Sequence, residues 1–268
     1  MRYIKSPKKL TTNKIISFFE SLNMGFVVNL SREYQESVND MSSDLKYRPQ
    51  LVDLYRLYQL LALNKRTTVL EFGSGYSSLM FAASLSALKG KYLPHVSKLR
   101  RNNPFELFIL ESEKKYLNIT KKRIDKYFKD NKYMDNIKIH YKASEVHMTT
   151  FNGRICTEYK SLHICNPDFI YLDGPEQFNV QGNINDFTTA HIDMMPMVSD
   201  ILKIENFLTP GTIILVDGRG ANAAFLRNNF QREWVYYNCE EYDQHIFYLN
   251  DHSLGEYNSA QLKFYRSK

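Results

Sequence analysis

The sequence predicts an α/β fold in which a doubly wound, mostly parallel sheet of seven strands carries helices on both faces. From residue 67 onward, short apolar runs rich in β-branched residues alternate with longer stretches of helical periodicity. Alternation of this kind is typical of a parallel sheet with right-handed crossovers. The chain has 268 residues, 43% of them hydrophobic, which is enough to bury one large core without disulfides.

Ahead of the sheet, the first 65 residues are expected to form an N-terminal helical extension. Helical periodicity covers residues 13–22 and 49–63, and a polar, irregular segment is expected between them. We therefore divide the chain into a helical cap, residues 1–65, and a second domain, residues 66–268.

The strand-like runs of the second domain are followed in most cases by a helix-like run. Strands are expected at residues 67–72, 106–110, 137–141, 168–172, 212–216, 234–237 and 245–249. Helices are expected at residues 77–88, 113–128, 186–207 and 221–230. Residues 90–104 and 149–167 fit neither pattern and are interpreted as insertions.

Charge does not by itself identify a partner. The formal net charge is +6 with an isoelectric point near 9, but the excess is dispersed. Its densest runs, residues 98–101 and 121–123, are explained equally well as solvated surface. A nucleic-acid partner is therefore not favoured, although the basic balance leaves that alternative open.

Cysteine usage and the absence of long apolar runs favour a cytoplasmic protein. Cys156, Cys165 and Cys239 lack the C-x-x-C spacing of a zinc site and do not suggest a disulfide framework. The N-terminus has no apolar run typical of a signal peptide, and no stretch reaches membrane-spanning length.

The first predicted strand ends in a possible ligand cradle, Glu71-Phe-Gly73-Ser-Gly75. Glycine permits positive φ angles and close approach of a ligand to the main chain, and Ser77 or Ser78 can cap the next helix. An acid at position 71 would repel the pyrophosphate of a dinucleotide, so it favours a cationic ligand such as S-adenosylmethionine, which carries an ammonium and a sulfonium group. A simple turn after a strand is the alternative.

The segment resembles motif I of class I S-adenosylmethionine-dependent methyltransferases, which reads acid-x-Gly-x-Gly-x-(Gly/Ser). The resemblance implies a Rossmann-like fold that binds S-adenosyl-L-methionine. It also implies cofactor contacts along the loop, from Glu71, Gly73, Ser74, Gly75, Ser77 and Ser78.

Polar residues also follow the second and third strands. Glu111 stands where a carboxylate can accept both ribose hydroxyls of an adenosine, although an acid at a helix N-terminus is the alternative explanation. Ala143-Ser144-Glu145 resembles the Ala-Ser-Gln of catechol-type O-methyltransferases, which implies that Ser144 and Glu145 contact the adenine. A helix cap at Ser144 is the alternative.

The fourth and fifth strands each end in an aspartate, Asp173 and Asp217. The segments Leu-Asp-Gly and Pro-Gly-Thr-Ile-Ile-Leu-Val-Asp resemble small-molecule O-methyltransferases of the macrocin and catechol type. This resemblance implies that both aspartates are catalytic and that Asp173 also faces the cofactor's methyl group. Asp173 would orient or deprotonate an acceptor hydroxyl; Asp-Gly-Pro is also ordinary turn chemistry. Because Gly218 replaces a third metal ligand of that family, we assign no metal ligands, while Mg²⁺ stays open.

Together, these resemblances imply an S-adenosylmethionine-dependent O-methyltransferase that acts on a small molecule or a sugar hydroxyl by in-line transfer. Two alternatives stay open at this point. One is an RNA ribose methyltransferase, and the other is a catalytically inactive, methyltransferase-like binding or scaffold protein. The acceptor and the oligomeric state are not predicted.

Overall fold

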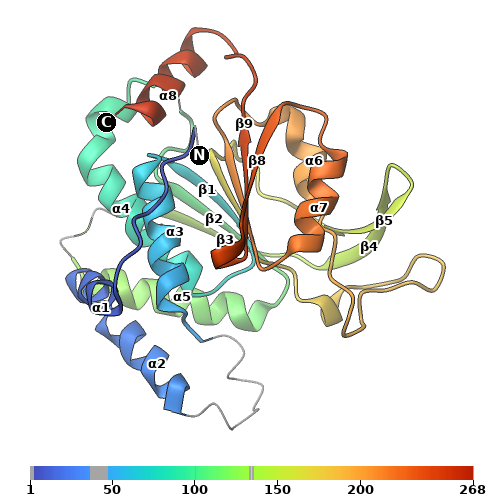
Figure 1. Cartoon of the computed structure of the whole chain (residues 1–268), viewed down its shortest axis with the longest axis horizontal. Coiled ribbons are helices and arrows are strands. Elements are labelled where there is room, and N and C mark those ends of the chain that lie inside the picture. The colour runs from blue at the N-terminus through green and yellow to red at the C-terminus, as the bar shows by residue number, and fades with distance from the viewer. Residues whose placement is uncertain (1–2, 37–47, 100, 133, 135, 268) are drawn as a thin grey trace.

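The computed structural model describes residues 3–36, 48–99, 101–132, 134 and 136–267 (Figure 1). The helices are α1 (Thr12–Ser21), α2 (Gly25–Glu36), α3 (Leu51–Leu63), α4 (Tyr76–Val96), α5 (Lys114–Asp130), α6 (Asp200–Ile204), α7 (Gly220–Asn229) and α8 (Glu256–Arg266), with short 3-10 helices η2 (Gln177–Asn179), η3 (Glu205–Phe207) and η4 (Glu240–Tyr242). The strands are β1 (Thr68–Phe72), β2 (Glu106–Glu111), β3 (Lys138–Ala143), β4 (Val146–Phe151), β5 (Arg154–Tyr159), β6 (Phe169–Leu172), β7 (Ile213–Asp217), β8 (Trp234–Cys239) and β9 (Gln244–Leu249).

Seven of these strands form one sheet in the order β3-β2-β1-β6-β7-β9-β8. Strands β1, β2, β3, β6 and β7 pair in parallel, whereas β9 pairs antiparallel with both β7 and β8. This confirms the predicted doubly wound, mostly parallel sheet. The strand order reverses between β1 and β6, and in such sheets the crevice beyond the carboxyl ends of the two strands is the usual ligand site.

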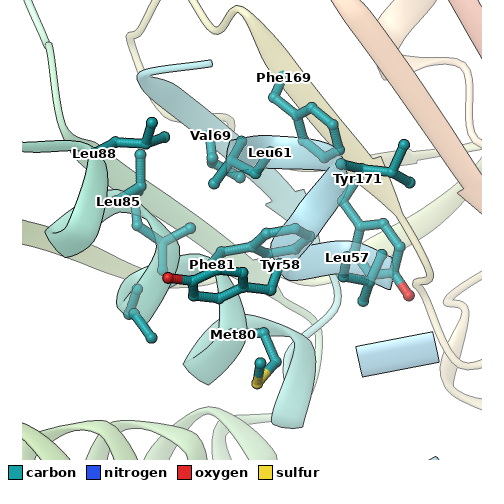
Figure 2. Close-up of a cluster of buried hydrophobic side chains, with 14 of the residues drawn as sticks. Leu57, Tyr58, Leu61, Val69, Met80, Phe81, Leu85, Leu88, Phe169 and Tyr171 are labelled. Carbon is teal, nitrogen blue, oxygen red and sulfur yellow. The ribbon is translucent and has the colours of Figure 1, made fainter. Parts of the chain in front are cut away.

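Alternate residues of the strands enter two separate cores, one on each face of the sheet. On one face, Val69, Phe169 and Tyr171 pack against helices α3 and α4, as Figure 2 shows with Leu57 and Phe81. The period of two follows from the pleat of a strand, which sends neighbouring side chains to opposite faces.

The opposite face is covered by α6, α7 and the β4–β5 hairpin. Leu70 and Phe72 of β1 point to this side, where Val146 of the hairpin and Leu226 of α7 are buried with them. Both faces therefore carry helices, as the sequence predicts.

In the N-terminal region, the expected irregular segment is replaced in part by a helix. Helix α2 covers Gly25–Glu36 and buries Val27 and Val28, while residues 37–47 lie outside the described part of the chain. The prediction missed α2 because only a narrow apolar stripe faces the core and the second half of the helix is mostly polar. The division of the chain at residue 65 stays a prediction.

The helix expected over residues 186–207 is wrong for most of its length. Only Asp200–Ile204 is α-helical, followed by η3. The chain before it is extended, because Met197 O accepts a hydrogen bond from Thr157 N and Ser199 N donates to Thr157 O. Pro196, which has no N–H to donate, also disfavours a helix there.

Two further elements were not expected from the sequence. The insertion before β6 is largely a hairpin, in which β4 and β5 pair antiparallel. Helix α8 closes the chain and buries Leu262, Phe264 and Tyr265. Among the described residues, no helix combines the length and the apolar character that crossing a membrane requires.

Asp168 ties the amino ends of β1 and β6 to α8. Its carboxylate is fully buried and accepts hydrogen bonds from the backbone N–H groups of Thr67 and Thr68, at 2.8–3.0 Å, and from the hydroxyl of Tyr265, at 2.8 Å. The guanidinium of Arg101 lies 3.5 Å away, with only 5% of its side chain exposed. A buried charge with this many partners is satisfied structurally.

We expect Asp168→Ala to lower the free energy of unfolding by about 3–5 kcal/mol, because it leaves Arg101 buried without its counter-ion. Urea denaturation followed by circular dichroism measures the change. Tyr265→Phe is the matched control, since it removes a single hydrogen bond and should cost about 1 kcal/mol. Equal, small effects of the two substitutions would contradict the assignment.

Candidate functional site

A pocket of about 410 Å³ opens at the point where the strand order reverses. Its walls come from segments that follow four parallel strands, namely the loops after β1, β6 and β7 and the end of β2 with the start of α5. Six of the site residues predicted from the sequence line this pocket: Gly73, Ser74, Gly75, Glu111, Asp173 and Asp217. The structure therefore brings together the predicted residues of four different strand ends.

The loops after β1 and β6 approach each other backbone to backbone. Gly73 has a φ of +107°, and a Cβ atom there would lie 3.2 Å from the carbonyl carbon of Asp173. A Cβ atom on Gly174 would lie 2.9 Å from the Gly73 nitrogen and 3.0 Å from the Tyr159 hydroxyl. Gly75, in contrast, is extended at φ 173°, so only Gly73 uses the conformational freedom that the sequence suggested for both.

Glu71 is buried, with 1% of its surface exposed, and only one of its two carboxylate oxygens accepts a hydrogen bond. Its Oε1 accepts a hydrogen bond from the Ser77 hydroxyl at 2.5 Å, whereas its Oε2 has no hydrogen-bond partner among the described residues. Burial raises the pKa of this carboxyl to about 8, against the hydrogen bonds from Ser77 and Ser78, and nearby Asp173 and Glu111 raise it further. A bound cation would offset this cost, since it favours the charged form.

Ser78 is buried at the start of α4, and its hydroxyl accepts a hydrogen bond from the Gly75 N–H at 3.2 Å. Ser77 donates to the Glu71 carboxylate, and Ser78 also accepts from the backbone at the helix start. Both hydroxyls favour the charged form of Glu71.

Glu111 lies at the opposite wall of the pocket and is held in place by three donors. Its Oε2 accepts from the Ser74 hydroxyl at 2.8 Å, and its Oε1 accepts from the Glu113 N–H at 2.9 Å and the Ser112 hydroxyl at 3.1 Å. Burial raises the pKa of Glu111 above its ordinary range, against these hydrogen bonds. The Ser74 contact joins the β1 loop to the end of β2.

Asp173 and Asp217 follow β6 and β7 at the centre of the pocket floor. Protein surrounds the Asp173 carboxyl on most sides, yet 54% of its side chain is open to solvent in the pocket. Burial raises its pKa to about 7; Asp217 and Glu111 add to the rise, and Arg219 opposes it. Asp217 accepts a 2.7 Å hydrogen bond from the Tyr171 hydroxyl, and burial raises its pKa.

Arg219 points into the protein rather than toward a free anion site. Its Nη2 donates to the carbonyl oxygens of Asp173 and Pro175, both at 3.0 Å. The guanidinium therefore ties the loop after β6 to the loop after β7 and is the nearest counter-charge to Asp173.

Ser144 and Glu145 do not line the pocket. The Ser144 hydroxyl accepts a hydrogen bond from the Ser161 N–H at 3.0 Å, and Glu145 forms surface ion pairs with Lys160 and His147. Strand β4 begins directly afterwards, so Ser144 caps no helix. Their proposed contact with adenine stays a prediction.

Several lining residues were missed by the sequence reasoning. Tyr76 and Tyr116 contribute rings to the pocket, and the Arg123 guanidinium lies 3.8 Å from the centroid of the Tyr76 ring. Met195 enters from the irregular segment before α6. Tyr76 occupies a variable position of the motif I segment, and no motif marks the other positions, because helix packing and a long loop bring them to the pocket. Within the described ranges, no three His, Cys, Asp or Glu side chains are arranged to hold a metal ion.

No protein family and no curated protein matches the sequence. Solved structures resemble the chain remotely. A methyltransferase from Podospora anserina, solved bound to SAH, is 14% identical over 92% of this chain and 100% of that chain, with a TM-score of 0.42. An O-methyltransferase from Bacillus cereus in complex with SAH is 14% identical over 91% and 92%, with a TM-score of 0.38. The O-methyltransferase TomG from Streptomyces achromogenes, involved in tomaymycin synthesis and in complex with SAM, is 13% identical over 92% of each chain, with a TM-score of 0.35. At this similarity no ligand or residue role is transferred to this chain.

Proposed function

We propose that this protein is an S-adenosylmethionine-dependent methyltransferase that methylates a hydroxyl group of a small molecule. The observation that carries the proposal is the buried Glu71 carboxylate, which has one oxygen without a partner and stands beside the positive-φ turn at Gly73. A buried acid in this state calls for a cation. The resemblance of the loop to motif I points to the same ligand.

Glu71 and the residues of the pocket fit the donor's separate groups. Glu71, buried behind the loop that lines the pocket, would hold the ammonium of the amino-acid part, either directly or through water. Glu111 lines the pocket and would accept the ribose hydroxyls, a role that two carboxylate oxygens suit well. The hydroxyl of Ser74, which now donates to Glu111, would be available to the ligand as well.

When bound, S-adenosylmethionine supplies a sulfonium methyl group that an acceptor oxygen displaces in line. The chain aligns the reactants, and alignment alone removes a large part of the entropic barrier. Asp173 would accept the proton of the acceptor hydroxyl, since a pKa of about 7 suits a general base near neutral pH. Arg219 holds the Asp173 loop, and the Tyr171 hydroxyl holds Asp217.

The charges of the pocket favour a small-molecule acceptor over RNA. Four acids, Glu71, Glu111, Asp173 and Asp217, are coupled to one another at this edge of the sheet. A phosphate backbone brought to this edge would be repelled, whereas RNA-binding surfaces are typically basic. An inactive binding protein would have no need for Asp173 and Asp217 at the strand ends in the pocket, so we favour an active enzyme.

We expect Glu71→Gln and Glu111→Gln each to weaken binding of S-adenosylhomocysteine by about 1–3 kcal/mol, because each removes a charged hydrogen-bond acceptor while keeping the shape. Isothermal titration calorimetry measures the loss. Glu20→Gln, an exposed position on α1, is the control and should bind as the wild type does. Unchanged affinity in both pocket variants would remove the basis of the proposal.

Affinity for S-adenosylhomocysteine should rise with pH from about pH 6 to about pH 8 and then level off. Below its pKa of about 8 the Glu71 carboxyl holds a proton; an ammonium ligand requires the charged form, so binding releases that proton and strengthens by up to about tenfold per pH unit. Calorimetry across this range measures the slope.

Glu71→Gln is the control for the pH dependence and should flatten the slope. The folding stability of the unliganded protein should depend on pH in the opposite sense. The folded state keeps a proton that the unfolded chain releases above its ordinary pKa of 4.5, so stability should fall as pH rises through this interval. An affinity that declines over the same interval would contradict the role of Glu71.

Asp173→Asn should leave affinity for S-adenosylhomocysteine unchanged and lower turnover by about 10²–10⁴-fold, because the amide cannot accept the acceptor's proton. Release of S-adenosylhomocysteine measures turnover once an acceptor is in hand. Wild-type turnover in this variant would exclude Asp173 as the general base.

A further inference from the structure

A second and larger cavity, of about 740 Å³, meets the donor pocket at Asp173, Asp217 and Gly218. Its other walls come from the N-terminal segment at Lys8–Leu10, the first turns of α3, and η4 with the turn that follows it. One of the shared residues, Asp173, is the one assigned above to proton transfer. An acceptor that reaches it from the side opposite the donor would therefore occupy this cavity, which we name the acceptor chamber.

The acceptor chamber is acidic although the protein as a whole is basic. Its lining includes six acids, Asp53, Asp173, Asp217, Glu240, Glu241 and Asp243, against three basic residues, Lys8, Lys9 and Arg56. In the whole chain, 35 Lys and Arg outnumber 29 Asp and Glu. The sign of the charge is thus reversed locally, at the place where the acceptor would bind.

Two of the three basic residues of the chamber are already engaged. Lys9 forms an ion pair with Glu241. Arg56 donates two hydrogen bonds to Gln244 Oε1, at 3.1 and 3.3 Å, and its guanidinium lies 3.5 Å from the centroid of the Tyr242 ring. Even with all three basic residues counted, acids outnumber cations two to one among the described residues of the lining.

Three carboxyls of the chamber, from Asp53, Asp217 and Asp243, act on one another electrostatically. Asp53 lies in the first turn of α3, where burial and the charge of Asp217 raise its pKa to about 6. Asp243, in the left-handed turn before β9, raises the pKa of Asp217 in turn. Its Oδ2 lies 3.8 Å from the place where a Cβ on Gly218 would stand, so this carboxyl lies beside the residue that the two cavities share.

We propose that the methyl acceptor is a small cationic molecule, a hydroxyl compound with a protonated amine that binds between Asp53 and Asp243 while its hydroxyl faces Asp173. The proposal rests on the function proposed above. Tyr55 and Tyr242 also line the chamber, and Arg56 occupies one face of the Tyr242 ring. Carboxylates are the usual counter-charge of an ammonium group. Anionic and neutral acceptors would leave the acids unpaired.

The test uses the full-length protein and matched sets of hydroxyl compounds: glucosamine and dopamine, their N-acetyl derivatives and their N-methyl derivatives. Acetylation removes the charge, whereas methylation adds bulk and keeps it. We expect kcat/KM, measured by S-adenosylhomocysteine release, to be at least about tenfold higher for a free amine and its N-methyl form than for the N-acetyl form. Calorimetry with S-adenosylhomocysteine-saturated protein should give the same order of affinities.

Asp53→Asn and Asp243→Asn should each reduce this preference by about tenfold, and Asp193→Asn, an exposed acid outside the chamber, should not. Affinity for S-adenosylhomocysteine, unchanged in all three, verifies that the variants fold. Equal use of the N-acetyl forms, or no binding of any amine by protein that does bind S-adenosylhomocysteine, overturns the cationic acceptor and leaves the proposed methyl transfer standing. Wild-type protein that fails to bind S-adenosylhomocysteine overturns both.

Discussion

Electrostatic crowding at the carboxyl edge of the sheet is the constraint on which the site depends. Parallel strands end at the same edge, so the acids at the ends of β2, β6 and β7 line one pocket, and Glu71 of β1 is buried beside them. Burial and mutual repulsion raise the pKa of Glu71 to about 8 and that of Asp173 to about 7. Such an arrangement is costly unless a cation binds there or a proton is exchanged there. Both uses are what a methyltransferase with a sulfonium donor requires.

The acids at the two ends of β6 have opposite environments. At the amino end, Asp168 is fully hydrogen-bonded and faces the guanidinium of Arg101, so its charge stabilises the junction of β1, β6 and α8. At the carboxyl end, Asp173 has Arg219 as its nearest counter-charge and is surrounded by other acids. The satisfied acid supports the scaffold, and the unsatisfied ones mark the site.

The sheet itself could be predicted because its strands follow a local rule. Each buried strand contains a short apolar run, and a polar residue stands at or near its end, at the edge where loops begin. This local pattern did not predict helix α2, the segment before α6 or helix α8. Their structure depends on distant partners: Ser199 is held extended by Thr157 of β5, and Tyr265 of α8 bonds to Asp168. Contacts of this kind leave no periodic trace in the local sequence.

The sequence by itself determined the order of the sheet's strands and helices along the chain, the turn at Gly73 and the identity of the acids at the strand ends. These features depend on short-range periodicity and on backbone sterics. Only the tertiary structure decided which of those acids share a pocket, that Arg219 turns inward to the Asp173 loop, and that Ser144 and Glu145 lie outside the pocket lining. It also decided that Asp53, from the helices before the sheet, joins Asp217 and Asp243 in one chamber. The physical reason is that charge and shape in a cavity are sums over residues far apart in the chain, and only folding places those residues together.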